Sequence, residues 1–192
     1  MKPSYPFPIG IEPLWCNPQN LSIPDPRLQN WLLDTGSLTE RLQAHCRDFK
    51  VQVLGQRQAE ISLEEITQLN LSAQQIKQAD WQVREVILWG DGQPWVFARS
   101  IIPEVLCSAV LASLGNQPLG KLIFNDPKFK RLPFEVTHMT ASKSMTQALQ
   151  LNSNSPLWGR RSVFKFQNVA MSVAEIFLPQ SPAYADMQQT GQ

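Results

Sequence analysis

The sequence predicts an α+β fold, with a single, mostly antiparallel β-sheet and helices packed on it. Asp91-Gly92, the dipeptide most typical of a two-residue hairpin turn, stands between two runs of aromatic and β-branched residues within Trp81–Pro103. Arg161–Phe166 and Ala170–Leu178 form a second pair of expected strands, with a turn near Gln167-Asn168. Few long helical segments separate these strands, and this order favours an antiparallel sheet over a parallel α/β arrangement.

Composition restricts the possible classes of function. The chain has 192 residues, which is enough for one domain with a sizeable core. Its 17 Lys and Arg residues nearly balance its 16 Asp and Glu residues, so charge gives no basis for a nucleic-acid or membrane partner. The 3 cysteines and 2 histidines are not spaced as a disulfide framework or a metal site, which indicates a reducing compartment. The N-terminal residues contain no continuous apolar run, so neither a signal peptide nor a membrane span is expected.

The chain is expected to form an arm, one domain and a tail. Residues 1–25 are rich in proline and predict an extended arm, held in part by Trp15 and Ile23. The domain is expected over residues 26–184, and the polar segment 185–192 is expected to be a frayed tail. No internal repeat and no low-complexity linker divides the domain.

The first part of the domain predicts two short helices and a strand. Arg27–Leu33 has the character of a short helix, and Ser37-Leu38-Thr39-Glu40 fits a capping box at the start of the next one. Phe49–Gln56 alternates between apolar and polar residues, as a strand does. Residues 57–80 are polar, and within them Leu63–Leu71 is expected to be partly helical or a loop.

The segments after the first hairpin predict two more helices and another strand. Glu104–Leu114 has the apolar spacing of a helix, and Pro118 is suited to the first position of a further short helix. Leu132–Met139 predicts a strand whose start is limited by a proline. Residues 140–156 are rich in Ser, Asn and Gln and carry no definite prediction.

Two arginines, Arg84 and Arg99, stand near the far ends of the hairpin strands. If Asp91-Gly92 is the whole loop, these arginines face each other on one side of the sheet, where two like charges repel. One interpretation is that each meets a surface carboxylate, for example Glu85 or Glu104. The other is a site for a small ligand with two acidic groups, because arginine binds carboxylates through two parallel hydrogen bonds. A register shift of one residue would place the arginines on opposite faces.

Glu175 is the second candidate, because it lies within the otherwise mostly apolar strand Ala170–Leu178. A carboxylate among apolar residues must find a cation or take up a proton. It therefore either forms a buried ion pair, with Arg84, Arg99, Arg160 or Arg161 as the possible partner, or is a carboxyl that exchanges a hydrogen bond or a proton with a ligand.

Two further features carry weaker signals. The helix starts at Leu38 and Leu119 offer free backbone N–H groups that favour anions, but every helix has such an end. Arg160 and Arg161 are adjacent, so on a strand they point to opposite faces, and at least one is expected in a surface ion pair. The sequence has no glycine-rich phosphate loop, no nucleophile elbow and no Cys–His dyad in a recognisable context.

Five segments together resemble the bacterial chorismate lyases, and they occur in that family's order. The matching segments are WLLDTGSLTERL at 31–42, VREVILWGDGQPWVFARSIIP at 83–103, LGNQPLGKLIF at 114–124, LWGRRS at 157–162 and AEIFLPQSPAY at 174–184. The pattern around the hairpin and the final AEIFLP segment are specific, and the resemblance covers most of the domain.

The resemblance implies an enzyme that removes the enolpyruvyl group of chorismate as pyruvate and leaves 4-hydroxybenzoate, an early step towards ubiquinone or plastoquinone. It also implies an antiparallel sheet with the ligand buried under helical flaps, and a reaction that uses no cofactor or metal. The expected protein is a cytoplasmic monomer whose partner is the small-molecule substrate.

The resemblance also implies the residues of the site. Arg84, Arg99 and Glu175 match family positions for binding and activity, and Leu38 and Leu119 match positions that contact the ligand partly through their backbone. Leu38 replaces a methionine that is common in the family. We assign Arg84 to the ring carboxylate of chorismate, Arg99 to the enolpyruvyl carboxylate, and Glu175 to the end of the ring that carries the 4-hydroxyl group and the ether.

The alternative function is a non-catalytic module that binds aromatic carboxylates, because the same fold serves as an effector-binding domain in some bacterial regulators. Such regulators carry an N-terminal winged helix-turn-helix, which residues 1–30 cannot supply. A carrier or sensor of hydroxybenzoate-like acids, without turnover, is therefore the form that this alternative takes.

Overall fold

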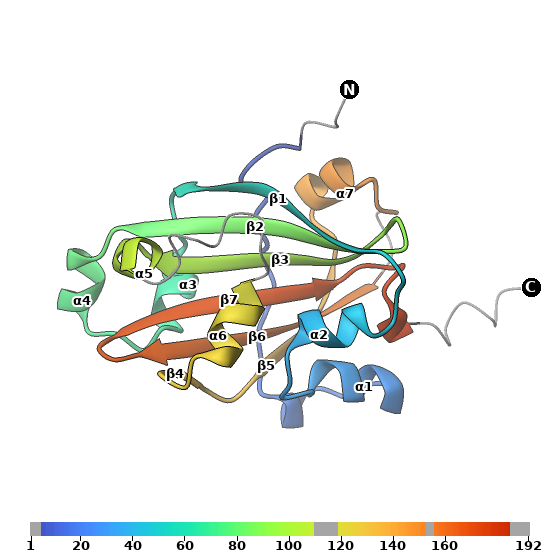
Figure 1. The fold of residues 1–192 in the computed structure, drawn as a ribbon, viewed down its shortest axis with the longest axis horizontal. Helices are drawn as coiled ribbons and strands as arrows, with labels where there is room; N and C mark the ends of the chain where they lie inside the picture. The colour runs from blue at the N-terminus through green and yellow to red at the C-terminus, as the bar shows by residue number, and fades with distance from the viewer. Residues whose placement is uncertain (1–4, 110–118, 153–155, 185–192) are drawn as a thin grey trace, which may run out of the picture.

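A seven-stranded antiparallel sheet forms the centre of the protein, as seen in the computed structural model, which describes residues 5–109, 119–152 and 156–184 (Figure 1). The strand order is β1-β2-β3-β7-β6-β4, and β5 also pairs with β6. The expected α+β class is confirmed. The strands are β1 (Phe49–Gln58), β2 (Trp81–Gly90), β3 (Gln93–Pro103), β4 (Phe129–Arg131), β5 (Glu135–Thr140), β6 (Pro156–Phe166) and β7 (Val169–Phe177).

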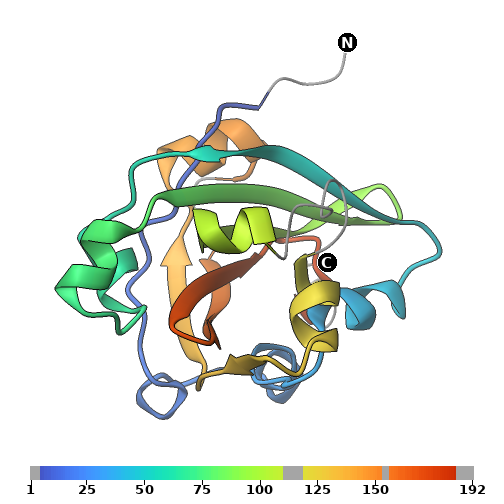
Figure 2. The ribbon, with the colours of Figure 1, turned by 60° about the vertical axis from the view of Figure 1, so that its left-hand side comes forward.

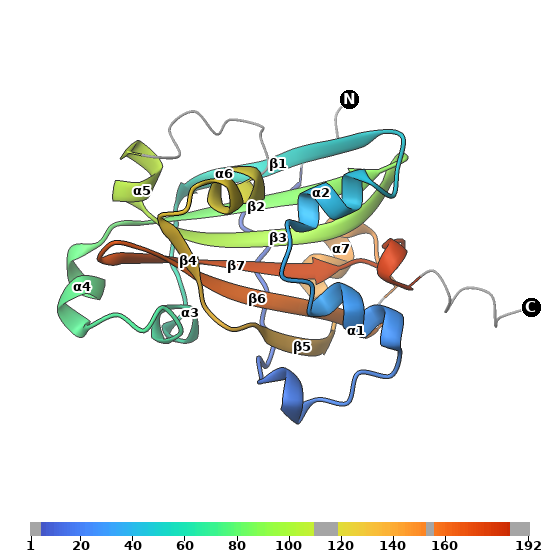
Figure 3. The same cartoon turned by 60° about the horizontal axis from the view of Figure 1, so that its bottom comes forward.

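Short helices cover both faces of this sheet. Helices α2 and α6 lie on one side, and α7 and the N-terminal arm lie on the other (Figures 2 and 3). The described helices are α1 (Pro26–Leu32), α2 (Leu38–Gln43), α3 (Leu63–Thr67), α4 (Ala73–Gln78), α5 (Glu104–Ala109), α6 (Leu119–Asn125) and α7 (Lys143–Leu149), with short 3-10 turns at Pro18–Asn20 and Pro182–Tyr184.

Alternation along the central strands separates two apolar cores. On β2, Val86 and Leu88 join the core on the side of α1 and α2, while Ile87 joins the core around α7 on the opposite side. Successive side chains of a strand point to opposite faces, so a single strand contributes to both layers. The same alternation decides which polar side chains of β2 and β3 share a face.

The first hairpin forms as expected, but its register differs from the predicted one. Asp91 and Gly92 both have positive φ angles, 48° and 77°, as a two-residue hairpin turn requires. Between the turn and the rest of the ladder, β3 contains one extra residue, because Trp89 pairs with Pro94 whereas Leu88 pairs with Val96. Arg84 therefore pairs with Ser100, and Arg99 pairs with Glu85. The expectation that Arg84 faces Arg99 is wrong.

The bulge at Trp95 has a local physical cause. Pro94 has no N–H group and cannot donate to the ladder, and proline on a strand is typically found at bulges and edges. The ring of Trp95 lies against Gly90, at a place where any side chain at Gly90 would collide with it. A one-residue bulge turns every later side chain of the strand to the other face, which separates the two arginines.

Several other expectations agree with the structure, and some differ from it. Ser37 caps α2 by accepting a hydrogen bond from the backbone N–H of Glu40, and the second hairpin turns at Gln167, whose φ is 52°. The expected strand Leu132–Met139 is found as β5, which starts at Glu135 after the proline, and the short strand β4 before it was not expected. Helix α7 was not expected. The expected end of the helix after Glu104, at Leu114, and the expected helix start at Pro118 lie outside the described residues.

The segment 57–80 contains two short helices, each with a complete capping box. Ser62 caps α3 in reciprocal hydrogen bonds with Glu65, and Ser72 caps α4 in the same way with Gln75. These Ser-x-x-Glu and Ser-x-x-Gln patterns are readable in the sequence.

The N-terminal arm is an integral part of the packing on the side of α7. Ile9 is buried, and the backbone N–H groups of Ile9 and Gly10 donate to the Glu85 carboxylate at 2.7 and 2.9 Å. Cys16 forms an antiparallel bridge with Val136. The arm thus crosses the sheet on the face opposite to α2 and α6.

Candidate active site

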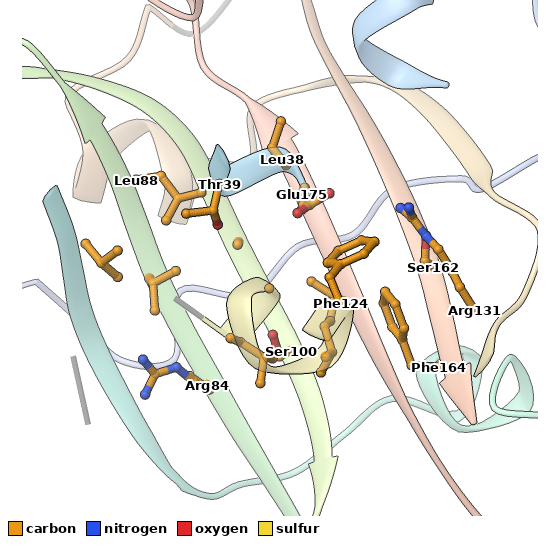
Figure 4. A pocket seen from close by; sticks show the side chains of 17 residues that line it. Leu38, Thr39, Arg84, Leu88, Ser100, Phe124, Arg131, Ser162, Phe164 and Glu175 are labelled. Atoms are coloured by element: carbon orange, nitrogen blue, oxygen red, sulfur yellow. The ribbon is translucent and has the colours of Figure 1, made fainter. Parts of the chain in front are cut away.

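A cavity lies between the sheet and the helices α2 and α6 (Figure 4). It contains about 610 Å³ of atom-free space, part of it open to solvent. Strands β1, β2, β3, β6 and β7 form its floor. The lining residues are Leu38, Thr39, Val51, Arg84, Val86, Leu88, Ala98, Ser100, Leu119, Gly120, Ile123, Phe124, Arg131, Ser162, Phe164, Val173 and Glu175.

Most of this lining is apolar, and its charged groups are arranged at two ends. Arg84 lies at one end, while Glu175 and Arg131 lie toward the other (Figure 4). An apolar cavity with a few convergent polar groups is the usual form of a site that orients a small ligand. This separation suits a ligand with an acidic group at one end and polar groups at the other.

Arg84 is held at its end of the cavity by β2 and by the neighbouring strand. Its side chain is buried, and Nη1 donates to Oε1 of Gln56 on β1 at 2.8 Å. Burial lowers the pKa of Arg84 from its ordinary value, because the charged form loses contact with water. A ligand carboxylate can accept two parallel hydrogen bonds from such a guanidinium. These bonds offset part of the hydration that the charged side chain loses on burial.

Glu175 is fixed on β7 by an ion pair with Arg160 on β6. Nε of Arg160 donates to Oε2 of Glu175 at 2.6 Å, and the two residues are directly opposite in the ladder. Nη1 of Arg160 donates to the carbonyl oxygens of Trp31 and Asp34, at 3.2 and 2.8 Å, which ties the end of α1 to the sheet. The ion-pair interpretation of Glu175 is therefore confirmed, with Arg160 as its partner, and the carboxylate also lines the cavity.

Leu38 and Leu119 are the first residues of α2 and α6, and both line the cavity. Their side chains are 3% and 8% exposed, so they close the cavity on the side away from the sheet. The two helices meet closely: a Cβ at Gly120 would lie 3.3 Å from Oγ1 of Thr39. The expected helical flaps are present as a pair of packed helix starts.

Arg99 lies on the other face of the sheet and does not line this cavity. Its guanidinium forms ion pairs with Glu65 at 2.7 Å and with the fully buried Glu85 at 2.9 Å, under the N-terminal arm. These carboxylates raise the pKa of Arg99 although burial opposes them. The expectation that Arg99 and Arg84 share one ligand is therefore wrong. The expected ion pair of Arg99 with Glu85 is present, but this carboxylate is buried and not at the surface.

Arg160 and Arg161 point to opposite faces, as expected from their adjacency. Arg160 belongs to the face of α1, whereas Arg161 pairs with Glu135 at 2.6 Å and stacks near the ring of Trp15. The Trp15 side chain expected to hold the arm is therefore placed over this ion pair.

Arg131, on β4, is a cavity residue that sequence reasoning missed. Its Nε donates to Oγ of Ser162 at 2.9 Å, and its guanidinium lies 3.8 Å from the ring centre of Phe134. The segment around it, KFKRLPF, has no periodicity that marks one of its cations as buried. The only available signal was the alternation that places Phe129 and Arg131 on one face of a short strand.

The described residues contain neither a cluster of metal-ligating side chains nor a membrane-crossing helix. In residues 5–109, 119–152 and 156–184, no cluster of three or more His, Cys, Asp or Glu side chains is arranged to hold a metal ion. Over the same ranges, no helix has the length and hydropathy of a membrane-crossing segment.

The fold is shared with ligand-binding domains of bacterial regulators. The effector domain of PhnF from Mycobacterium smegmatis aligns with a TM-score of 0.56 at 12% identity, over 77% of this chain and 91% of that one. The ligand-binding domain of a putative GntR-family regulator from Bordetella bronchiseptica aligns with a TM-score of 0.54 at 14% identity, over 70% and 86% of the two chains. At such low identity, the likeness is one of fold.

The sequence itself gives a closer relationship. The chorismate lyase family model matches residues 11–189. A probable chorismate pyruvate-lyase of Pseudoalteromonas atlantica is 52% identical over 183 residues, which cover 95% of each chain. A second, from Shewanella amazonensis, is 38% identical over 93% of this chain and 94% of its own. The chain therefore belongs to the chorismate lyase family and is an enzyme of the lyase class.

Proposed function

We propose that the protein eliminates pyruvate from chorismate and leaves 4-hydroxybenzoate, and that the reaction takes place in the cavity under α2 and α6. The observation that carries this proposal is the placement of buried Arg84 and of Glu175 on opposite sides of an apolar cavity. 4-Hydroxybenzoate has a carboxylate and a hydroxyl group at opposite ends of one ring. Arg84 would bind the carboxylate, and Glu175 would accept a hydrogen bond from the hydroxyl group.

The chemistry needs orientation and enclosure more than it needs a reactive side chain. The ether bond at C3 of chorismate breaks, the hydrogen at C4 leaves, and the electron pair of that C–H bond completes the aromatic ring. The departing enolpyruvyl group becomes pyruvate when its methylene carbon receives a proton. Aromatisation makes the step strongly favourable. A site that holds the reactive conformer and excludes water can therefore account for much of the rate enhancement.

The side chains of the cavity fit this requirement. Leu38 and Leu119 close the cavity from α2 and α6, and Val86 and Ala98 form part of its apolar floor. Arg160 holds the Glu175 carboxylate in place, so that Glu175 can orient the 4-hydroxyl group next to the breaking bond. We assign Glu175 the role of hydrogen-bond acceptor, and Arg99 a role in holding the sheet and the arm.

The proposed product defines the biological context. 4-Hydroxybenzoate supplies the aromatic ring of quinones, so we place the enzyme at an early step towards ubiquinone or plastoquinone, as a monomer in the cytoplasm. The even balance of charges and the scattered cysteines are in keeping with a free enzyme that acts on a small metabolite in a reducing compartment.

The direct test is turnover of chorismate by the purified protein. Pyruvate would be followed by a coupled lactate dehydrogenase assay, and 4-hydroxybenzoate by chromatography, and the two should appear in equal amounts. A matched sample with heat-inactivated protein measures the spontaneous breakdown of chorismate. Binding of 4-hydroxybenzoate without any production of pyruvate would contradict the lyase and favour a binding module for aromatic carboxylates.

A further inference from the structure

Arg131 is the cation of the cavity that the proposed contacts with 4-hydroxybenzoate do not use. It extends from β4 to the end of the cavity where Glu175 lies (Figure 4). Nε donates to Oγ of Ser162 at 2.9 Å and Nη1 donates to the carbonyl oxygen of Thr35 at 3.2 Å. Its guanidinium also stacks on the ring of Phe134. These contacts fix the position of the charge without neutralising it.

The charge of Arg131 is poorly compensated by the protein. Among the described residues, no carboxylate forms an ion pair with it, whereas Arg99, Arg160 and Arg161 each pair with at least one carboxylate. Burial, and after it the positive charge of Arg160, lower the pKa of Arg131 to about 10, although the carboxylates of Glu175 and Asp34 act in the opposite direction. An anion placed beside Arg131 would offset this desolvation and repulsion.

The shape of chorismate places an anion at this end of the cavity. The molecule has one carboxylate on ring carbon C1 and a second on the enolpyruvyl group, which is attached through oxygen to C3. C3 is adjacent to C4, the carbon that carries the hydroxyl group, and C4 lies across the ring from C1. When Arg84 binds the C1 carboxylate and Glu175 the 4-hydroxyl group, the enolpyruvyl carboxylate lies near Glu175 and far from Arg84.

We propose that Arg131 binds the enolpyruvyl carboxylate of the substrate, an inference that rests on the proposed lyase function. Arg131 thereby takes the place expected for Arg99, which faces away from the cavity. Arg131 lines the cavity, and its contacts with Ser162 and Phe134 hold the guanidinium in place there.

This assignment makes Arg131 a residue that distinguishes the substrate from the aromatic product. Chorismate uses both arginines, and 4-hydroxybenzoate uses only Arg84, because the second carboxylate leaves with pyruvate. Binding energy at Arg131 is therefore available before the ether bond breaks and is absent from the product complex. The contact with Arg131 therefore positions the leaving group of the substrate, and it does not tighten the binding of 4-hydroxybenzoate.

The test compares two aromatic ligands that differ in the second carboxylate. 4-Hydroxybenzoate has one carboxylate, and 3-(carboxymethoxy)-4-hydroxybenzoate adds another on an ether oxygen next to the hydroxyl group and cannot undergo the elimination. Calorimetry with wild type, Arg131→Met, Arg131→Lys and Lys130→Met gives the affinity ratio of the two ligands. Lys130→Met is the control, because it removes a positive charge from the residue directly before Arg131 on β4, where the side chain is exposed.

We expect Arg131→Met to weaken the dicarboxylate by about tenfold or more and to change the affinity for 4-hydroxybenzoate by less than about twofold. Arg131→Lys keeps the charge and should restore part of the difference, and Lys130→Met should behave as wild type. With chorismate itself, Arg131→Met should raise KM by a similar factor.

The proposal would be overturned if both Arg131 variants kept the wild-type ratio of affinities for the dicarboxylate and 4-hydroxybenzoate. An equal loss of affinity for both ligands in Arg131→Lys would also overturn it, because it would show a structural role. If Arg131→Met does not fold, as judged by its melting temperature, the Arg131→Lys ratio decides. Failure of the proposed function is distinguishable, because it would appear as a wild-type protein that does not convert chorismate.

Discussion

Arg84 and Arg99 show how one residue type takes two roles at neighbouring positions of a hairpin. Arg84 faces a cavity and is held by Gln56, a neutral partner on the adjacent strand. Arg99 faces the opposite layer, where Glu65 and Glu85 neutralise it. The surroundings of the two arginines, and not the residue type, separate an arginine that lines the cavity from one that is held in ion pairs.

The first prediction at the scale of single residues concerns Arg84. We expect Arg84→Ala to weaken the binding of 4-hydroxybenzoate by about 2–4 kcal/mol, because the ligand carboxylate would enter a buried site without its cation. Isothermal titration calorimetry measures the loss. Arg47→Ala removes the same charge from an exposed position and should leave the affinity unchanged. Equal affinity in the wild type and Arg84→Ala would refute the assignment of the ring carboxylate.

The second prediction concerns Glu175. Glu175→Gln keeps the shape of the side chain and an oxygen that can accept from Arg160, but it removes the negative charge that orients the 4-hydroxyl group. We expect kcat to fall by about a hundredfold, while the free energy of unfolding changes by less than about 2 kcal/mol. Glu135→Gln is the matched control, since Glu135 pairs with the adjacent Arg161 on the other face. Wild-type turnover in Glu175→Gln would show that Glu175 has only a structural role.

At the scale of elements, the bulge in β3 and the N-terminal arm together decide where the charges lie. The bulge turns Arg99 of β3 to the face opposite α2 and α6, where it pairs with Glu85 of β2. The arm then covers Glu85 and donates two backbone N–H groups to it. The extended, proline-rich arm thus supplies hydrogen-bond donors to the buried Glu85 carboxylate, whose other partner is the cation of Arg99.

This arrangement predicts that Arg99 contributes to folding and not to ligand affinity. Arg99→Met should lower the free energy of unfolding by about 3 kcal/mol, because the fully buried Glu85 would lose its cation. Urea denaturation measures the change, and calorimetry on the folded variant should give nearly wild-type affinity for 4-hydroxybenzoate. Lys50→Met, at an exposed position of β1, serves as the control. If Arg99→Met lost ligand affinity while its stability stayed unchanged, the prediction would be contradicted and Arg99 would have a role in ligand binding.

At the scale of the whole molecule, one sheet separates a ligand layer from a structural layer. The cavity, α2 and α6 occupy one face, while the arm, α7 and the ion pairs of Arg99 and Arg161 occupy the other (Figures 2 and 3). Domains of two bacterial regulators share this fold, and a shared fold does not by itself fix a function.

The whole fold also predicts how stability depends on alkaline pH. Burial raises the pKa of the Cys107 thiol from 9.0 to about 11, and burial raises the pKa of Tyr184 above its ordinary value. Above about pH 9 the unfolded chain releases these protons more readily than the folded chain does, so the free energy of unfolding falls as pH rises toward about 11. Urea denaturation across this range measures the slope, which should be shallower in Cys107→Ser. An identical slope in that variant would contradict the contribution of Cys107.

Local patterns in the sequence were sufficient for much of the fold. The Asp91-Gly92 turn, the cap at Ser37 and the alternation of β7 depend on neighbouring residues, whose preferences act over a few positions. The α+β class followed from the order of such segments. Family resemblance identified the chemistry, and it pointed to Arg84 and Glu175, which the structure places in one cavity.

The pairing of charges depended on contacts between distant parts of the chain. A single extra residue at Trp95 reversed the face of Arg99, because side chains alternate along a strand and a bulge inverts the alternation. Arg131 joined the cavity through the pairing of β4 with β6, and Glu85 found its donors in the arm, 75 and 76 residues away in sequence. Turns and caps follow from short-range preferences, whereas the partners of buried charges are set by register and packing that only the folded chain establishes.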